Sequence, residues 1–231
     1  MKLKTLLFLA LSLLVASSAF GANSLAVTAA AAMGGTGGTA CGGAPCGLAV
    51  TVDGSTNPAR VVDDTPNDEA VYRAQFYLDM NDVVQGEQTF WVLARGTEQS
   101  SFTSAFQLIM TRKFNQWRLF LRARTNGSVD RFTGRITWDD ADLRADTLLQ
   151  IEFYASDAPG VPGGDVELSV LQGVNSGTSV NTFDIFGNLL NNSTKNVDDI
   201  LLGAVGNIPA GQLNGTFHID EFASFRTLAP Q

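Results

Sequence analysis

Apolar and polar residues alternate along several short stretches of this chain, and this alternation restricts the fold more than any other feature. It recurs at residues 72–78, 117–124, 149–155 and 166–171. Successive side chains of a β-strand point to opposite faces, so a period of two predicts strands with one buried face and one wetter face. In residues 117–124 the two alternating sets are Trp117, Leu119, Leu121 and Ala123, and Arg118, Phe120, Arg122 and Arg124.

Turn-forming pairs separate these stretches. Asn126-Gly127 and Asn214-Gly215 tolerate the positive φ angles of tight turns. Residues 104–112 and 117–124 form a predicted hairpin around the turn at residues 113–116. Charged residues make up only 16% of the chain and glycine numbers 23, a balance typical of turn-rich β proteins. These features predict an all-β, two-sheet antiparallel sandwich, with helix only as a short turn at residues 139–145 or 184–190.

The first residues have the pattern of a secretory signal peptide. Lys2 and Lys4 precede an apolar run over residues 6–15, and small residues follow. We expect residues 1–21 to be removed by cleavage between Gly21 and Ala22. An uncleaved membrane anchor is the alternative, but the run is shorter than the ~20 apolar residues that span a bilayer. The sequence therefore predicts a secreted or periplasmic protein with no membrane span in the mature chain.

Residues 22–47 are rich in alanine, glycine and threonine and hold little bulky apolar surface. We expect a flexible lead-in here, followed by one β-sandwich domain at residues 48–231. In an exported protein, the close pair Cys41 and Cys46 predicts a disulfide that stiffens one local turn. A redox or zinc site is the alternative, which the spacing and the lack of a neighbouring histidine disfavour.

The whole chain is acidic. Its formal net charge is −8, and cleavage of residues 1–21 would remove the two positive charges of Lys2 and Lys4. No cluster of basic residues is evident, so the composition argues against nucleic acid or anionic lipid as a partner. Neutral ligands and divalent cations are compatible with this charge.

Residues 214–226 read NGTFHIDEFASFR, an Asn-Gly pair followed by an apolar run, one acid pair and a basic residue. This order resembles the last core strand of laminin-G-like, concanavalin A-like β-sandwich domains, chiefly exported bacterial ones. Weaker similarities at residues 64–78, 106–121, 151–153 and 198–205 extend the resemblance over most of the chain. The resemblance implies a two-sheet jelly roll of about a dozen strands, and it favours binding over catalysis.

No catalytic signature stands out in the sequence. Many concanavalin A-like glycan hydrolases carry a Glu-x-Asp-x-x-Glu pattern, which alternation sets on one sheet face. The nearest approach here is Asp165-Val166-Glu167, which lacks the third acid. His218, the only histidine, lies in mid-strand rather than beside a nucleophile. We therefore expect that the chain is not an enzyme, with a degenerate glycoside hydrolase or lyase as an alternative.

The adjacent acids Asp220 and Glu221 are interpreted as structural. Neighbouring strand residues point to opposite faces, so the two carboxylates cannot act as one dyad. One of them must point inward or toward an end of the sandwich. A buried carboxylate needs partners, such as backbone N–H groups or an arginine like Arg73 or Arg226.

Aromatic residues are the candidate ligand contacts, because a flat ring matches the apolar C–H face of a sugar. The candidates, each of which could equally belong to the core, are Trp91, Trp138, Tyr77 and Tyr154. The resemblance also implies calcium as a candidate cofactor, since such folds often hold it on acidic loops. Its candidate ligands are Asp79, Asp82, Asp139 and Asp142.

The predicted function is an exported, non-catalytic domain that recognises extracellular or cell-surface carbohydrate. The alternative is a structural or adhesive surface protein that binds other proteins.

Overall fold

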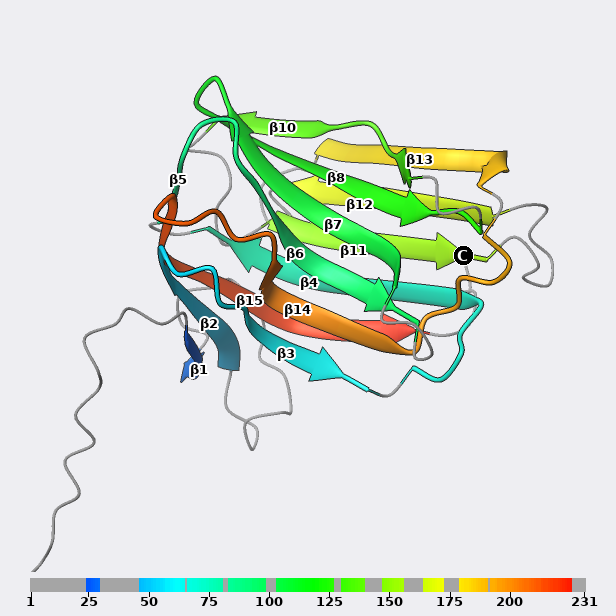
Figure 1. Cartoon of the computed structure of the whole chain (residues 1–231), viewed down its shortest axis with the longest axis horizontal. Coiled ribbons are helices and arrows are strands. Elements are labelled where there is room, and N and C mark those ends of the chain that lie inside the picture. Colours follow the sequence, from blue (N-terminus) through cyan, green and yellow to red (C-terminus); the bar gives the residue numbers. More distant parts are fainter. Residues whose placement is uncertain are drawn as a thin grey trace, which may run out of the picture.

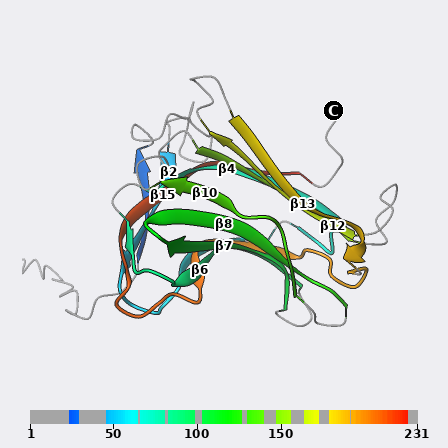
Figure 2. The same ribbon diagram turned by 90° about the horizontal axis from the view of Figure 1, so that it is seen from above.

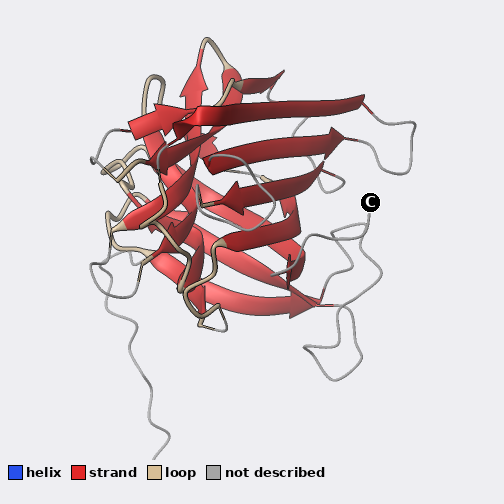
Figure 3. Cartoon of the chain, turned by 90° about the vertical axis from the view of Figure 1, so that its right-hand side faces the viewer, coloured by secondary structure: helices blue, strands red, loops and turns tan. Residues whose placement is uncertain are grey.

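The computed structural model describes residues 24–29, 46–64, 66–80, 83–98, 103–126, 130–139, 147–155, 164–172, 179–190 and 192–225. These residues form fifteen strands and no helix (Figure 3). The strands make two antiparallel sheets that pack face to face (Figure 1). The predicted all-β, two-sheet antiparallel jelly-roll sandwich is therefore confirmed.

The eight-stranded sheet contains, in lateral order, β1 (Ser24–Ala29), β2 (Cys46–Asp53), β15 (Leu213–Phe225), β4 (Val71–Asp79), β11 (Thr147–Tyr154), β12 (Gly164–Gln172) and β13 (Ser179–Leu190). The short β5 (Val84–Gln85) also pairs with β15. The seven-stranded sheet contains β10 (Ile136–Asp139), β8 (Gln116–Arg124), β7 (Ser104–Lys113), β6 (Phe90–Thr97), β14 (Asp199–Gly206) and β3 (Ala59–Asp63), and β9 (Asp130–Phe132) pairs with β8.

One apolar core fills the space between the two sheets. Tyr72 and Phe153 of the eight-stranded sheet contact Phe106 of the other, with ring centroids 6.4 and 5.7 Å away. Full burial of one such large side chain contributes roughly 1.5–3 kcal/mol. The alternate residues of β8 that carry the apolar pattern lie in this core, namely Trp117, Leu119, Leu121 and Ala123.

One of the turns predicted from the sequence is present in the structure, and another is not. Phe114 and Asn115 join β7 to β8 with φ of 58° and 57°, as the predicted hairpin requires. The pair Asn214-Gly215 is not a turn, because both residues lie inside β15 and the chain reverses just before them. The expected helical turn at residues 184–190 is also wrong, since those residues continue β13.

The segment expected to be a flexible lead-in contains a strand. β1 pairs in antiparallel register with β2, from Ser24 opposite Thr51 to Ala29 opposite Cys46. Main-chain hydrogen bonds to an open sheet edge need no bulky side chains. A segment made mostly of small residues can therefore form this strand. The predicted signal peptide, residues 1–21, lies outside the described residues. The expected disulfide also lies outside them, because neither Cys41 nor the side chain of Cys46 is described. No helix in the described part of the chain is long and apolar enough to cross a membrane.

A β-bulge interrupts β15 at the acid pair. Asp220 lies opposite Tyr77 of β4 but Ala223 lies opposite Gln75, so β15 holds an extra residue between these positions. Strict alternation after Ile219 would turn Glu221 toward the core. The extra residue resets the period, and Phe222 packs against the core. Asp220 is buried, and the side chain of Glu221 lies outside the described residues.

Candidate functional site

The seven-stranded sheet curves so that its outer face is concave. Figure 2 shows β7 and β8 arched, with their concave side turned away from the eight-stranded sheet. Val92, Leu201 and Val205 form a second apolar cluster, separate from the core between the sheets. Val92 is 0% exposed and Val205 2% exposed although they do not belong to that core. These side chains lie at the floor of the concave face, called the groove below, and expose almost no apolar surface there.

A polar row runs across this groove beside the apolar one. Strand register aligns neighbouring residues of five strands in the order Leu201, Arg95, Gln107, Arg122 and Phe132. Gln107 is buried, and its Oε1 accepts a hydrogen bond from Nη2 of Arg122. The groove floor therefore presents the guanidinium groups of this row, while the amide of Gln107 is bonded to Arg122 and to Ser104.

Arg95 lies at the centre of this row, on β6. Its Nε is buried without a hydrogen-bond partner, and no ion pair to Arg95 occurs among the described residues. Burial lowers the pKa of the Arg95 guanidinium, and the nearby charges of Arg60 and Arg122 lower the pKa further. Three arginines thus approach one another where no described carboxylate neutralises the central one.

The arginines on either side have partial partners. Nη1 of Arg60 donates to the backbone oxygen of Val205 at 3.2 Å. Arg122 and Arg124 lie 3.5 and 3.8 Å from the carboxylate of Asp130. These residues and Ser104 line a small, open hollow on the surface. The charge balance across the row is therefore positive, in a chain whose overall charge is negative.

Aromatic residues continue the groove toward β9. The rings of Phe120 and Phe132 lie 5.9 Å apart, and the guanidinium of Arg135 lies 5.4 Å from the Phe120 centroid. Phe132 is largely exposed. Cations beside exposed ring faces are suited to a ligand that carries both acid groups and apolar surface.

This face was not predicted from the sequence. The signal was present in residues 117–124, where Arg118, Arg122 and Arg124 share one parity of the alternation. The expectation that the chain has no basic cluster was wrong for this sheet, because net charge does not report how charges are distributed in space.

The four aromatic residues predicted to contact a ligand have different environments in the structure. Trp91 is 0% exposed, packs 5.2 Å from the Phe217 ring, and donates from Nε1 to Oε1 of Gln85. No face of its ring is open to a sugar, which corrects the expectation for this residue. Tyr77 is half-buried on the eight-stranded sheet, and Trp138 lies in β10 with its side chain outside the described residues.

Tyr154 belongs to a hydrogen-bonded cluster on the outer face of the eight-stranded sheet. Its hydroxyl donates to Oε2 of Glu152 at 2.6 Å and accepts from Nη2 of Arg73 at 2.7 Å. Nη2 of Arg73 also lies 2.8 Å from Oε2 of Glu152. Burial and the Glu152 hydrogen bond raise the pKa of Tyr154 to about 12. Here the arginine has its counter-charge, in contrast to Arg95.

The predicted acidic sites are not brought together. Asp79 ends β4 and Asp139 ends β10, on different sheets, while Asp82 and Asp142 lie outside the described residues. Within the residues that the structure describes, no three His, Cys, Asp or Glu side chains are grouped to hold a metal ion.

The other acids and the histidine of the sequence analysis lie on the eight-stranded sheet. His218 is opposite Asp79 in the register of β15 and β4. Asp165 and Glu167 lie on β12, where Glu167 accepts a hydrogen bond from Ser169 at 3.0 Å. They are on the opposite sheet from the arginine groove.

Comparison with known proteins finds only distant structural similarity. No protein-family model and no curated protein matches the sequence. Among solved structures, the chain is similar to an alginate lyase from Alteromonas sp. 272, with 10% identity over 78% of this chain and 79% of that one and a TM-score of 0.37. A family 7 alginate lyase in complex with substrate gives 11% identity over 84% and 75%, with a TM-score of 0.42. Arcelin-5, a lectin-like defence protein from Phaseolus vulgaris, gives 10% over 87% and 91%, with a TM-score of 0.34.

The strand order is that of a two-sheet, jelly-roll β-sandwich, the fold that the resemblance in the sequence implied. One expectation is contradicted. We expected no enzyme, but alginate lyases are among the similar structures. The missing Glu-x-Asp-x-x-Glu pattern concerns glycan hydrolysis only, so its absence was no ground for excluding catalysis.

Proposed function

We propose that the concave face of the seven-stranded sheet binds an acidic polysaccharide, with Arg95 as the central contact. The observation that supports this most is the half-buried guanidinium of Arg95, which lies between Arg60 and Arg122 and whose Nε has no partner. Removing a cation from water and placing it beside like charges is unfavourable unless something compensates for the cost. An anionic ligand in the groove supplies that compensation.

Carboxylate is the acid group best matched to this row. A guanidinium presents parallel N–H donors that fit a carboxylate in a bidentate way, and such charge-assisted bonds are stronger than neutral ones. Gln107 lies between Arg95 and Arg122, and its amide is bonded to Ser104 and to Arg122, so it positions Arg122 beside Arg95. The groove would therefore hold consecutive acid groups on one ligand.

The shape of the face supports a polymer of sugars over a small anion. The row crosses β14, β6, β7, β8 and β9 and ends at Phe132, whose ring is largely exposed. A uronate ring offers a carboxylate and an apolar C–H face side by side. The predicted export of the chain would bring it into contact with such polymers in the cell envelope or outside the cell. Binding of another protein, the alternative in the sequence analysis, has no comparable observation behind it.

The test is titration calorimetry with polygalacturonate at low salt. Wild-type protein is compared with Arg95→Met and with Arg73→Met, which removes the same charge from the opposite sheet. Loss of one charge-assisted contact predicts an affinity about 10- to 100-fold weaker for Arg95→Met. The Arg73→Met affinity should stay close to wild type, and added salt should weaken all binding.

Neutral dextran and single-stranded DNA are the comparison polymers. Equal affinity for all three polymers, or no effect of Arg95→Met, would refute the proposal. Size-exclusion chromatography of the incubated polygalacturonate measures in the same samples whether the bound chain is also cut.

A further inference from the structure

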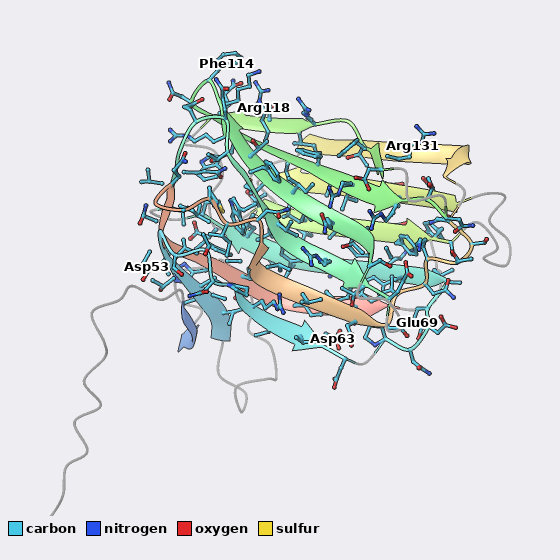
Figure 4. The ribbon with its side chains drawn as sticks, in the orientation of Figure 1. Asp53, Asp63, Glu69, Phe114, Arg118 and Arg131 are labelled. Atoms are coloured by element: carbon cyan, nitrogen blue, oxygen red, sulfur yellow. The ribbon has the colours of Figure 1, made fainter. Side chains whose placement is uncertain are left out.

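The tip of the β7–β8 hairpin carries an exposed aromatic ring between two cations. Phe114 is 71% exposed. Nζ of Lys113 lies 5.0 Å from the centroid of its ring, and Cζ of Arg118 lies 5.7 Å from it. Figure 4 shows Phe114 and Arg118 together at this tip, away from the core. The ring therefore has no packing role within the described residues that would explain a large apolar side chain here.

The backbone at Phe114 is in a conformation that a bulky residue adopts at a cost. Its φ is 58°, in the left-handed region, where the Cβ of an L-residue is crowded. Glu87 fixes this turn, because its carboxylate oxygens accept hydrogen bonds from the N–H groups of Asn115 at 2.9 Å and Phe114 at 2.8 Å. The same bonds lower the pKa of Glu87. A strained residue that is also exposed and held in place is a candidate for function.

The tip lies on the same concave face as the arginine row, with Arg118 four residues along β8 from Arg122, or about 13 Å. Arg118, which approaches the Phe114 ring, has the same parity on β8 as Phe120 and Arg122. These residues share one face of the strand, and that face is the concave one. β7 and β8 are arched (Figure 2), and the hairpin that joins them bounds the concave face at one end of these strands, called its wall below.

We propose that the ring of Phe114 is a stacking platform for one sugar ring of the acidic polysaccharide, with Lys113 and Arg118 contacting its acid group. This inference rests on the proposed function and extends it from the floor of the groove to its wall. A uronate ring has an apolar face next to a carboxylate, which matches an aromatic ring next to cations. An anionic membrane also offers charge and apolar surface, but the place of the tip on the same concave face as the arginine row favours the glycan.

The experiment compares two carboxylate polymers, polygalacturonate and polyglutamate, of which only the first has sugar rings. The variants are Phe114→Asn, Phe114→Trp and the control Val84→Ala, which trims an exposed side chain on β5. Asparagine tolerates a left-handed backbone, so the melting temperature of Phe114→Asn should stay level or rise. Calorimetry should show polygalacturonate bound about three- to tenfold more weakly by Phe114→Asn, with polyglutamate unchanged. Phe114→Trp and Val84→Ala should bind as wild type does.

The outcomes separate this inference from the proposed function. If Phe114→Asn binds polygalacturonate as wild type does while Arg95→Met does not, stacking on Phe114 is refuted. The proposed binding at Arg95 is then supported. If wild-type protein does not bind polygalacturonate, both proposals fail. An equal loss of both polymers assigns the effect to charge or structure and refutes stacking. Loss of binding only to phosphatidylglycerol vesicles assigns the tip to a membrane and also refutes it.

Discussion

Replacing Arg95 with methionine is expected to stabilise the protein, although it removes a charged side chain that spans the groove. Arg95 and Arg122 lie on β6 and β8, two strand spacings apart, or about 9.5 Å between backbones. At that distance two like charges repel by roughly 0.4 kcal/mol in water, and by roughly 1.7 kcal/mol at an effective dielectric constant of about 20. A half-buried site lies between these limits, so this pair costs about 1 kcal/mol. Arg60 adds a smaller term.

The stability of Arg95→Met should therefore exceed that of wild type by about 1–2 kcal/mol, or about 2–8 °C in melting temperature for a chain of this length. Methionine keeps an unbranched stem over the apolar floor, which retains the packing of the arginine side chain. The matched change Arg73→Met should have the opposite sign. It removes the ion-pair partner of Glu152 at 2.8 Å, leaves that carboxylate only its neutral hydrogen-bond donors, and should cost about 1–3 kcal/mol.

The assay is urea unfolding followed by tryptophan fluorescence, with the slope of each transition checked for equality. Repeating it at high salt should shrink the gain of Arg95→Met, because screening weakens the repulsion that the substitution removes. A destabilised Arg95→Met variant would show that Arg95 has a structural partner and would refute the reasoning. So would a change of the same sign in Arg95→Met and Arg73→Met.

Two further predictions concern the sheets themselves. The pKa of Tyr154 is raised from 10.0 to about 12, so its contribution to stability is complete below pH 10 and is lost as the pH rises toward 12. The urea midpoint of Tyr154→Phe should accordingly fall less steeply than that of wild type over this range, and parallel curves would contradict the assignment. Gly203 has a φ of 122°, and a Cβ there would lie 2.5 Å from the backbone oxygen of Ala59, so Gly203→Ala should cost about 2–3 kcal/mol. The control Gly206→Ala, where only the flexible end of Arg95 is in the way, should cost less than about 1 kcal/mol in the same measurement, and equal losses would argue against strain at Gly203.

The fold class could be predicted from the sequence because it depends on local patterns. The period of two in residues 117–124 reflects strand geometry alone, and the same residues that alternate in the sequence divide between core and groove in the structure. Turn chemistry was less reliable. Phe114-Asn115 forms the predicted hairpin turn, whereas Asn214-Gly215 lies within β15, because pairing with β2 overrides the local preference of that dipeptide.

The candidate site could not be predicted in the same way. A tryptophan in a strand has the same local pattern whether its ring faces the core or a ligand, and only the packing of Trp91 on Phe217 distinguishes the two. The arginine row also depends on pairing over long sequence distances. β14 lies between β3 and β6, and this brings Arg60 near Arg95.

The sequence by itself determined that alternating strands would form a sandwich with one buried face per strand, because side-chain alternation is a property of the extended backbone. Only the tertiary structure decided that Arg95 faces outward. Strict alternation from the buried Trp91 would turn Arg95 toward the core. A bulge between Val92 and Ala94 adds one residue, so that Leu93 and Ala94 both join the core and Arg95 reaches the groove. A bulge depends on how two strands pair, and that pairing cannot be read from the sequence of either strand alone.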